Sequence, residues 1–270
     1  MSSLSQNRPR KRFSQNFLVD RHFIERIVAA IGPKRGDRLV EIGPGRGALT
    51  RPLLERVDHM TVIEIDRNLA ADLRTAHPPE RLTVIVADAL TVDLGAIHAG
   101  ASDLRIVGNL PYHISSPLLF HCARYIAHVA DLHFMLQAEV VDRMAAAPDT
   151  PEYGRLSVTL QSAFAVEKLF RVPAGAFQPV PAVESAVVRL TPLGAARPYI
   201  RDQRVFEAIV AAGFGQRRKT LRNALQKHIG ADALLRLGVD PGVRAETLPV
   251  AAFAAIANAV ALAQGAFAES

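Results

Sequence analysis

The sequence predicts an α/β fold, in which a doubly wound, mostly parallel sheet is followed by a small all-helical domain. Two observations support this prediction. Short apolar runs alternate with helical patterns up to residue 192, and beyond residue 198 the pattern is helical throughout. Such alternation is typical of a parallel sheet covered by helices on both faces. We therefore expect a large domain over residues 1–195, including a basic N-terminal arm over 1–20, and a helical domain over 196–270.

Seven apolar runs are the predicted strands of this sheet. The first five are "RLVEIG" (38–43), "MTVIEI" (60–65), "LTVIVA" (82–87), "LRIVG" (104–108) and "LHFML" (132–136). They are continuous rather than alternating, as expected of strands buried on both faces. Two later runs, "RLSVTLQSAF" (155–164) and "SAVVRLTP" (185–192), are predicted to complete the sheet at one edge, with the last run antiparallel.

Composition favours a globular protein of a reducing compartment. The 270 residues are 49% hydrophobic and contain one cysteine, Cys122, so a disulfide within the chain is impossible. The N-terminus has no apolar signal segment. The alanine-rich stretch 250–268 carries Asn258 and Gln264, and we expect a helix of a soluble domain there. We expect a cytoplasmic monomer with no membrane association.

Positive charge is concentrated in two places. Residues 1–38 contain nine Lys/Arg and three Asp/Glu, and the segment "RRKTLR" (217–222) contains four basic residues. Two such clusters favour a polyanionic partner, and nucleic acid is the expected one, although a solvated surface without a partner is the alternative. The candidate phosphate contacts are Arg10, Lys11, Arg12, Arg217, Arg218, Lys219 and Arg222.

A glycine-rich loop, "VEIGPGRGALT" (40–50), follows the first strand and precedes a helix. Gly43 and Gly45 allow a tight turn and a close approach of the backbone to a ligand. The spacing also fits a dinucleotide-binding pattern. Glu41, however, would lie poorly beside a pyrophosphate, whereas its carboxylate suits the ammonium and sulfonium groups of S-adenosylmethionine (SAM). SAM is therefore the expected cofactor, and a glycine turn without a ligand is the alternative.

Acidic residues end the next two strands. Glu64 lies 21 residues after Gly43, where an acid can accept hydrogen bonds from ribose hydroxyls. Asp66 is its nearest competitor for that role. Asp88 ends the third strand and can accept a hydrogen bond from an adenine amino group; its alternative role is a helix N-cap.

The stretch "GNLPYHISSPLLFH" (108–121) provides acceptors for an amine. The Asn109 side-chain oxygen and the Leu110 carbonyl, displayed by the turn at Pro111, can both accept hydrogen bonds from an aromatic amine, and Tyr112 can stack on a flat base. Two acceptors can hold an adenine nitrogen in a more tetrahedral geometry with its lone pair toward a methyl group. No strong base is needed, because the nitrogen becomes acidic once it is methylated. An ordinary Asn-Pro loop is the alternative.

These motifs together resemble the ribosomal RNA adenine dimethyltransferases, which methylate two adjacent adenosines near the 3′ end of small-subunit rRNA. The resemblance runs from about residue 11 to residue 225 and rests on "KRFSQNFLVD", "EIGPGRGALT", "VIEID", "NLPY", "FMLQ.EVV", "YGRLSV", "F.P.P.VES" and "RRKTLRNAL". Two positions depart from the family pattern: His113 follows "NLPY", and Ala138 stands where a lysine is common.

The resemblance implies a Rossmann-like, SAM-dependent methyltransferase domain with a helical C-terminal domain. It also implies dimethylation of adenine N6 in 16S rRNA, within the small ribosomal subunit or its precursor, during ribosome assembly. In that family Asn16 and Leu18 would close over the cofactor, and Phe177 would form a second aromatic wall for the target base. Gly43, Gly45, Glu64, Asp88 and Asn109 match the family's cofactor positions.

Three other functions stay open at this point. The first is a large-subunit (23S) rRNA adenine methyltransferase of the antibiotic-resistance type, which shares the glycine loop and the Asn-Leu-Pro-Tyr motif. The second is an NAD-dependent oxidoreductase, which Glu41 and "NLPY" disfavour. The third is an rRNA-binding assembly factor whose catalysis is secondary. A metal site is not expected, because the nine histidines are scattered without ligand spacing.

Overall fold

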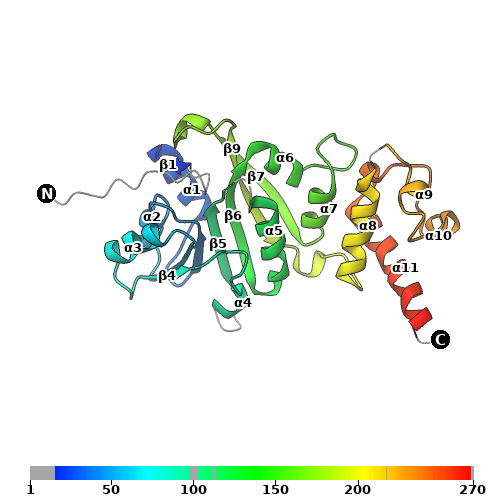
Figure 1. Ribbon diagram of the computed structural model, residues 1–270, viewed down its shortest axis with the longest axis horizontal. Helices are drawn as coiled ribbons and strands as arrows, with labels where there is room; N and C mark the ends of the chain where they lie inside the picture. Colours follow the sequence, from blue (N-terminus) through cyan, green and yellow to red (C-terminus); the bar gives the residue numbers. More distant parts are fainter. Residues whose placement is uncertain (1–15, 98–102, 112–113, 217, 269–270) are drawn as a thin grey trace. The chain divides into compact units, whose positions relative to one another are not determined.

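The structure is a computed structural model that describes residues 16–97, 103–111, 114–216 and 218–268, the last four by backbone alone (Figure 1). The chain forms two compact units. The first unit comprises Met1–Val141 and Val166–Pro192, and the second comprises Asp142–Ala165 and Leu193–Ser270.

A seven-stranded sheet organises the first unit. Its strand order is β4-β3-β2-β5-β6-β9-β7. The strands are β2 Arg38–Ile42, β3 Met60–Glu64, β4 Leu82–Val86, β5 Leu104–Asn109, β6 Val129–Gln137, β7 Phe164–Val172 and β9 Ser185–Pro192. Strands β2 to β6 pair in parallel, and β9 runs antiparallel to β6. The mostly parallel α/β sheet and its antiparallel late strand are thus confirmed.

The helices are α1 Arg21–Ile31, α2 Thr50–Leu54, α3 Arg67–Ala76, α4 Leu94–Ile97, α5 Ser115–Arg124, α6 Ala138–Met144, α7 Arg155–Gln161, α8 Gln203–Gly215, α9 Leu221–Ala224, α10 Ala231–Arg236 and α11 Val250–Ala268. Single 3-10 turns lie at Ile126–His128, Ala174–Ala176, Gly194–Ala196 and Ala245–Thr247. A separate two-stranded ribbon pairs β1 (Phe17–Leu18) with β8 (Phe177–Gln178) in antiparallel register.

Local capping explains where several helices begin and end. The Asp20 carboxylate accepts the backbone N–H groups of residues 22 and 23 at the start of α1, and Gly32 ends that helix in a left-handed conformation. Asp66 and Asp202 cap α3 and α8 in the same way. These caps fix the residues at which α1, α3 and α8 begin.

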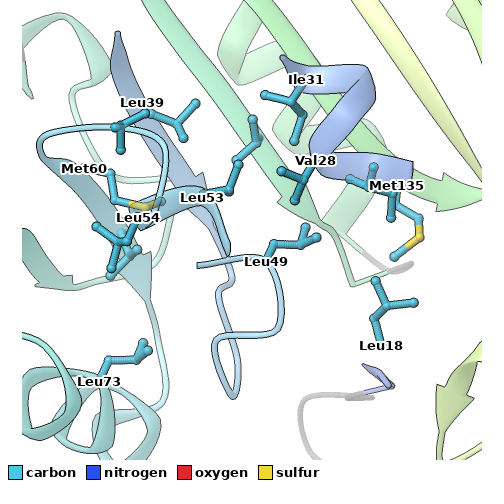
Figure 2. Close-up of a cluster of buried hydrophobic side chains, with 14 of the residues drawn as sticks. Leu18, Val28, Ile31, Leu39, Leu49, Leu53, Leu54, Met60, Leu73 and Met135 are labelled. Carbon is cyan, nitrogen blue, oxygen red and sulfur yellow. The ribbon is translucent and has the colours of Figure 1, made fainter. Parts of the chain in front are cut away.

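One face of the sheet is covered by α1, α2 and α3. Side chains of these helices, such as Val28, Leu53 and Leu73, pack in one cluster with strand residues such as Leu39 and Met60 (Figure 2). Helix α5 crosses in front of the central strands in Figure 1 and buries Leu118, Leu119 and Cys122. This packing holds the carboxyl ends of the parallel strands at one edge of the sheet.

The predicted strand over 155–164 is wrong. Residues Arg155–Gln161 form α7, and β7 begins only at Phe164. The β-branched residues Val158 and Thr159 favour a strand, but every residue from Leu156 to Leu160 is buried, so tertiary packing overrides local propensity.

The two units also divide the chain differently from the domain boundary expected near residue 195. The break before the C-terminal helices falls at residues 192 and 193, and residues 142–165 group with those helices. Tyr153 explains this grouping, because it is fully buried in a cluster with Phe206 and Phe253 and donates a hydrogen bond to the Leu248 carbonyl at 2.9 Å. Among the described residues, no helix combines the length and apolarity needed to cross a membrane.

Candidate cofactor and target site

A cavity of about 400 Å³ lies at the carboxyl ends of the parallel strands. All the residues predicted to bind the cofactor line it, and so do all those predicted for the reaction except Tyr112, which lies outside the described residues. These lining residues are Asn16, Leu18, Glu41, Gly43, Gly45, Glu64, Asp88, Asn109, Leu110, Pro111 and Phe177. The cavity is in the position that ligands take in doubly wound sheets.

The glycine loop forms one wall of the cavity. Gly43 and Gly45 have φ angles of 68° and 56°, in the left-handed region that only glycine adopts readily. A Cβ atom on Gly45 would lie 3.2 Å from the Phe17 ring, so this glycine also makes room for the β1 segment. The loop therefore brings backbone close to whatever occupies the cavity.

Glu64 is fixed at the end of β3 by backbone donors. Its Oε2 accepts the N–H of Gly45 at 3.1 Å, and its Oε1 accepts the N–H of Asp66 at 2.9 Å. Burial nevertheless raises the pKa of Glu64, and the two backbone hydrogen bonds oppose that rise. Asp66, its competitor for the ribose role, instead caps α3.

Glu41 is a buried carboxyl group within the cavity wall. It is 2% exposed, and its Oε2 accepts the Thr50 hydroxyl at 2.6 Å. Desolvation raises its pKa to about 7, the Thr50 hydrogen bond lowers it, and the nearby Glu64 raises it further. Two neighbouring acids with raised pKa values favour a cationic ligand, because a positive charge would stabilise both carboxylates. The residues thus fit SAM, whose ammonium and sulfonium groups are positive.

Asp88 follows β4 and takes part in a local turn. Its carboxylate accepts the N–H of Leu90 at 3.0 Å, and its carbonyl accepts the Thr91 hydroxyl at 2.8 Å. Because α4 starts only at Leu94, the helix N-cap alternative is wrong. The carboxylate lies at the cavity and can accept a further hydrogen bond.

Asn109 is the last residue of β5, and Leu110 and Pro111 follow it on the way to α5. The Asn109 side-chain nitrogen donates to the carbonyl of Asn16 at 3.3 Å, and the Leu110 N–H donates to the Met135 carbonyl at 3.1 Å. The Pro111 carbonyl accepts from the Ile114 N–H and the Ser115 hydroxyl, which attaches the loop to the start of α5. The loop is therefore held from three sides.

Phe177 approaches the cavity from the β1–β8 ribbon. Leu18 is its register partner, and the Ala176 carbonyl accepts the N–H groups of Val19 and Asp20. Phe177 is 3% exposed, and its ring belongs to the same apolar cluster as Leu18. The ribbon thereby joins the predicted cofactor cover to the predicted wall for the target base.

Sequence reasoning missed several further lining residues, among them Phe17, Arg46 and Ile65. The Arg46 guanidinium lies 4.5 Å from the centre of the Phe17 ring. Ile65 follows Glu64 and is 46% exposed, which is unusual for a large apolar side chain at a strand end. All three lie inside sequence motifs assigned to the site, and this position was the signal that could have identified them as lining residues.

The predicted RNA contacts are described only in part. Arg10, Lys11, Arg12 and Arg217 lie outside the described residues. Arg218, Lys219 and Arg222 are exposed on the second unit. Their segment is pinned by backbone hydrogen bonds from Leu221 to Val243 and from Arg222 to Pro241. Two positions depart from the family pattern. Ala138 is buried and donates its N–H to the Glu184 carbonyl, and His113 lies outside the described residues.

Comparison with known proteins places this geometry in a family. The family model for ribosomal RNA adenine dimethylase matches residues 6–262. A relative in Thiobacillus denitrificans, named ribosomal RNA small subunit methyltransferase A, is 55% identical over 92% of this chain and 96% of its own length. A relative of the same name in Bordetella pertussis is 54% identical over 97% of this chain and 98% of its own length.

Two solved structures share the fold. A dimethyladenosine transferase from Plasmodium falciparum superposes with a TM-score of 0.76 at 23% identity, covering 89% of this chain and 95% of that one. The 23S rRNA methyltransferase ErmE superposes with a TM-score of 0.69 at 27% identity, covering 91% of this chain and all of that one. With a matching family model over nearly its whole length and relatives above 50% identity, this chain belongs to the ribosomal RNA adenine dimethylase family.

Proposed function

We propose that this protein transfers methyl groups from SAM to N6 of two adjacent adenosines near the 3′ end of 16S rRNA during assembly of the small subunit. The observation that carries the proposal is the cavity in which Glu41 and Glu64 face the same space as Asn109. It joins acids suited to a cationic methyl donor with an amide suited to an aromatic amine.

Similarity favours the small-subunit substrate over the large-subunit one. The relatives above 50% identity carry the small-subunit name, whereas the 23S enzyme ErmE is 27% identical. Membership of the dimethylase family also excludes the NAD-dependent oxidoreductase considered from the glycine spacing.

The positions of the lining residues support the roles that we assign in the cofactor site. SAM, when bound, supplies an electrophilic methyl group. Glu41 stabilises its positive charge, Glu64 accepts hydrogen bonds from the ribose hydroxyls, and Asp88 accepts one from the adenine amino group. Gly43 and Gly45 let the backbone approach, while Asn16 and Leu18 cover the ligand from the β1 side.

The chemistry at the target nitrogen requires positioning rather than a strong base. The Asn109 Oδ1 and the Leu110 carbonyl accept hydrogen bonds from the adenine amine, which orients its lone pair toward the methyl group. Tyr112 and Phe177 stack on the two faces of the base, which must leave its RNA stack to enter the site. The proton is lost to solvent after methylation, because the methylated nitrogen is acidic.

We assign RNA binding to the basic residues Arg10, Lys11, Arg12, Arg217, Arg218, Lys219 and Arg222. Contacts of this kind act on phosphates and weaken with salt. We further propose that the protein acts as a cytoplasmic monomer.

Transfer of radiolabelled methyl groups from SAM to unmethylated small subunits tests this function, with large subunits in parallel. Label recovered as N6,N6-dimethyladenosine from the small subunit alone is the expected result. Label in the large subunit would reassign the substrate. Absence of label in either subunit, with SAM binding intact, would contradict the enzymatic proposal and favour a binding role in assembly.

A further inference from the structure

Three consecutive residues at the N-terminal end of the described chain contact three different parts of the site. The Asn16 carbonyl accepts from the Asn109 amide, the Phe17 ring lies against the glycine loop, and Leu18 pairs with Phe177. The segment therefore contacts the amine acceptor, the cofactor loop and the base wall at once. None of the sequence motifs assigned a role to Phe17, which stands between the two residues of the predicted cofactor cover.

The contact to Asn16 determines which way the Asn109 amide faces. A carboxamide has a donor side and an acceptor side, and only the NH₂ group can approach a carbonyl oxygen. With Nδ2 directed at the Asn16 carbonyl, at 3.3 Å, Oδ1 is the atom that stays available as an acceptor at the cavity. The opposite orientation would present a donor to the target amine, and that amine would then lack one of its two acceptors.

Phe17 is in turn held on both sides. One edge of its ring would lie 3.2 Å from a Cβ at Gly45, so the ring lies directly over the glycine loop. The Arg46 guanidinium lies 4.5 Å from the ring centroid, at a distance typical of a cation–π contact. Beyond Phe17, the β1–β8 pairing and the two N–H groups on the Ala176 carbonyl fix the backbone. The Asn16 carbonyl belongs to the peptide bond that joins Asn16 to Phe17, so the anchored Phe17 ring limits how far that carbonyl can move.

We propose that Phe17 is a positioning residue: held between Gly45 and Arg46, it keeps the Asn16 carbonyl on the Asn109 amide and so presents Oδ1 to the target nitrogen. This inference rests on the proposed methyl transfer. The Phe17 ring contacts the glycine loop and, through the Asn16 carbonyl, orients Asn109. It therefore connects the cofactor loop to the amine acceptor. Loss of the ring should therefore impair transfer even when SAM is bound.

The test compares Phe17→Leu and Phe17→Tyr with the unaltered protein. Leucine keeps an apolar side chain but has no face for the guanidinium, whereas tyrosine keeps the ring. SAM affinity is measured by calorimetry, and methyl transfer to unmethylated small subunits is measured in single turnover at saturating SAM. We expect Phe17→Leu to lose about 10- to 100-fold in the single-turnover rate, since small misplacements of reacting groups cost that much. We expect Phe17→Tyr to retain the rate.

A second readout does not depend on activity. The side-chain amide signals of Asn109 in a ¹⁵N spectrum, identified by their absence in Asn109→Asp, should shift toward free-amide values in Phe17→Leu and not in Phe17→Tyr. Phe170→Leu is the matched control. The Arg26 guanidinium lies 4.0 Å from the centre of the Phe170 ring, so this ring makes a similar cation–π contact. Phe170 packs on the apolar cluster and does not line the cavity. It should change neither readout.

Two outcomes would overturn the positioning role. One is a Phe17→Leu protein that binds SAM more weakly yet transfers methyl at the normal rate once saturated, which would make Phe17 a cofactor contact only. The other is an Asn109 amide signal that is unchanged in Phe17→Leu. A wild-type protein that transfers no methyl to either subunit would instead overturn the proposed function, and the amide signals would still decide whether Phe17 orients Asn109.

Discussion

At the scale of single residues, folding stability and cofactor binding favour opposite protonation states of the buried acid Glu41. The fold is more stable with the protonated acid, whereas a cationic cofactor favours the carboxylate. Its pKa in the folded protein is raised to about 7 from 4.5, so the folded state holds a proton that the unfolded state releases. The resulting stabilisation of the protonated form is present below pH 4.5 and is lost as the pH rises to 7. Above pH 7 the folded protein carries a buried carboxylate whose desolvation the Thr50 hydrogen bond offsets only in part.

Replacement of Glu41 by Gln should therefore stabilise the protein without its cofactor at pH 8. The expected gain in free energy of unfolding is on the order of 3 kcal/mol, and it should shrink to about 1 kcal/mol near pH 5. Denaturant unfolding at the two pH values measures it. A variant that is less stable at pH 8 would show that the Thr50 hydrogen bond outweighs the desolvation of the carboxylate.

Binding of SAM should release a proton near neutral pH. The cationic ligand favours the carboxylate forms of both Glu41 and Glu64, whose pKa values are raised in the protein without its cofactor. SAM affinity should fall as the pH drops below 7, approaching about tenfold per pH unit for one linked proton. Calorimetry in buffers of different ionisation enthalpy counts the proton, and the count should fall in Glu41→Gln.

Gly108 shows how closely two strands approach beneath the site. A Cβ atom there would lie 2.5 Å from the carbonyl oxygen of Ile42 on the adjacent strand β2. Gly108→Ala should therefore cost about 1–3 kcal/mol of folding free energy, because backbone rather than a flexible side chain must move. Gly175→Ala is the control, since nothing lies within 4 Å of its Cβ position. Thermal unfolding of both variants compares them, and equal melting temperatures would contradict the steric argument.

At the scale of elements, one arginine ties the amino-terminal ends of the central strands to α1. The Arg105 guanidinium binds Asp37 at 2.6 Å and Asp131 at 2.9 Å, and it donates to the Ile31 carbonyl at the end of α1. Its side chain is 14% exposed. The pKa of Asp131 is lowered, because hydrogen bonds and charge from His133 and Arg105 outweigh its desolvation.

Arg105→Met should destabilise the first unit by about 3–5 kcal/mol at pH 7, because it leaves two partly buried carboxylates without their cation. The loss should shrink in acid. The stabilisation linked to Asp131 is present above its unfolded pKa and is lost as the pH falls through its lower folded value. Denaturant titrations at pH 7 and pH 3, above and below the unfolded value of 3.8, measure the difference, and a loss that did not depend on pH would contradict it.

The sequence was sufficient to predict elements whose local pattern and tertiary environment agree. Strands β2 to β6 are continuous apolar runs, and their ends display the acids and the amide that line one cavity. Helix α7 was mistaken for a strand because the sequence of Arg155–Gln161 does not show that these residues are buried. Their burial results from packing within the second unit. The contact of Phe17 with Gly45 and Arg46 joins residues nearly thirty positions apart, so no local pattern could reveal it.

At the scale of the whole molecule, positive charge should govern substrate affinity separately from cofactor affinity. Arg218, Lys219 and Arg222 are exposed on a segment whose backbone is fixed, and none of them lines the cofactor cavity. Replacing all three by Gln should weaken binding to small subunits and reduce the slope of log affinity against log salt by about one per lost phosphate contact, with SAM affinity unchanged. Arg236→Gln, also exposed on the second unit, is the control and should leave the slope unaltered. Filter binding across a salt series measures both slopes, and a triple variant with the original slope would move the RNA contacts elsewhere on the protein.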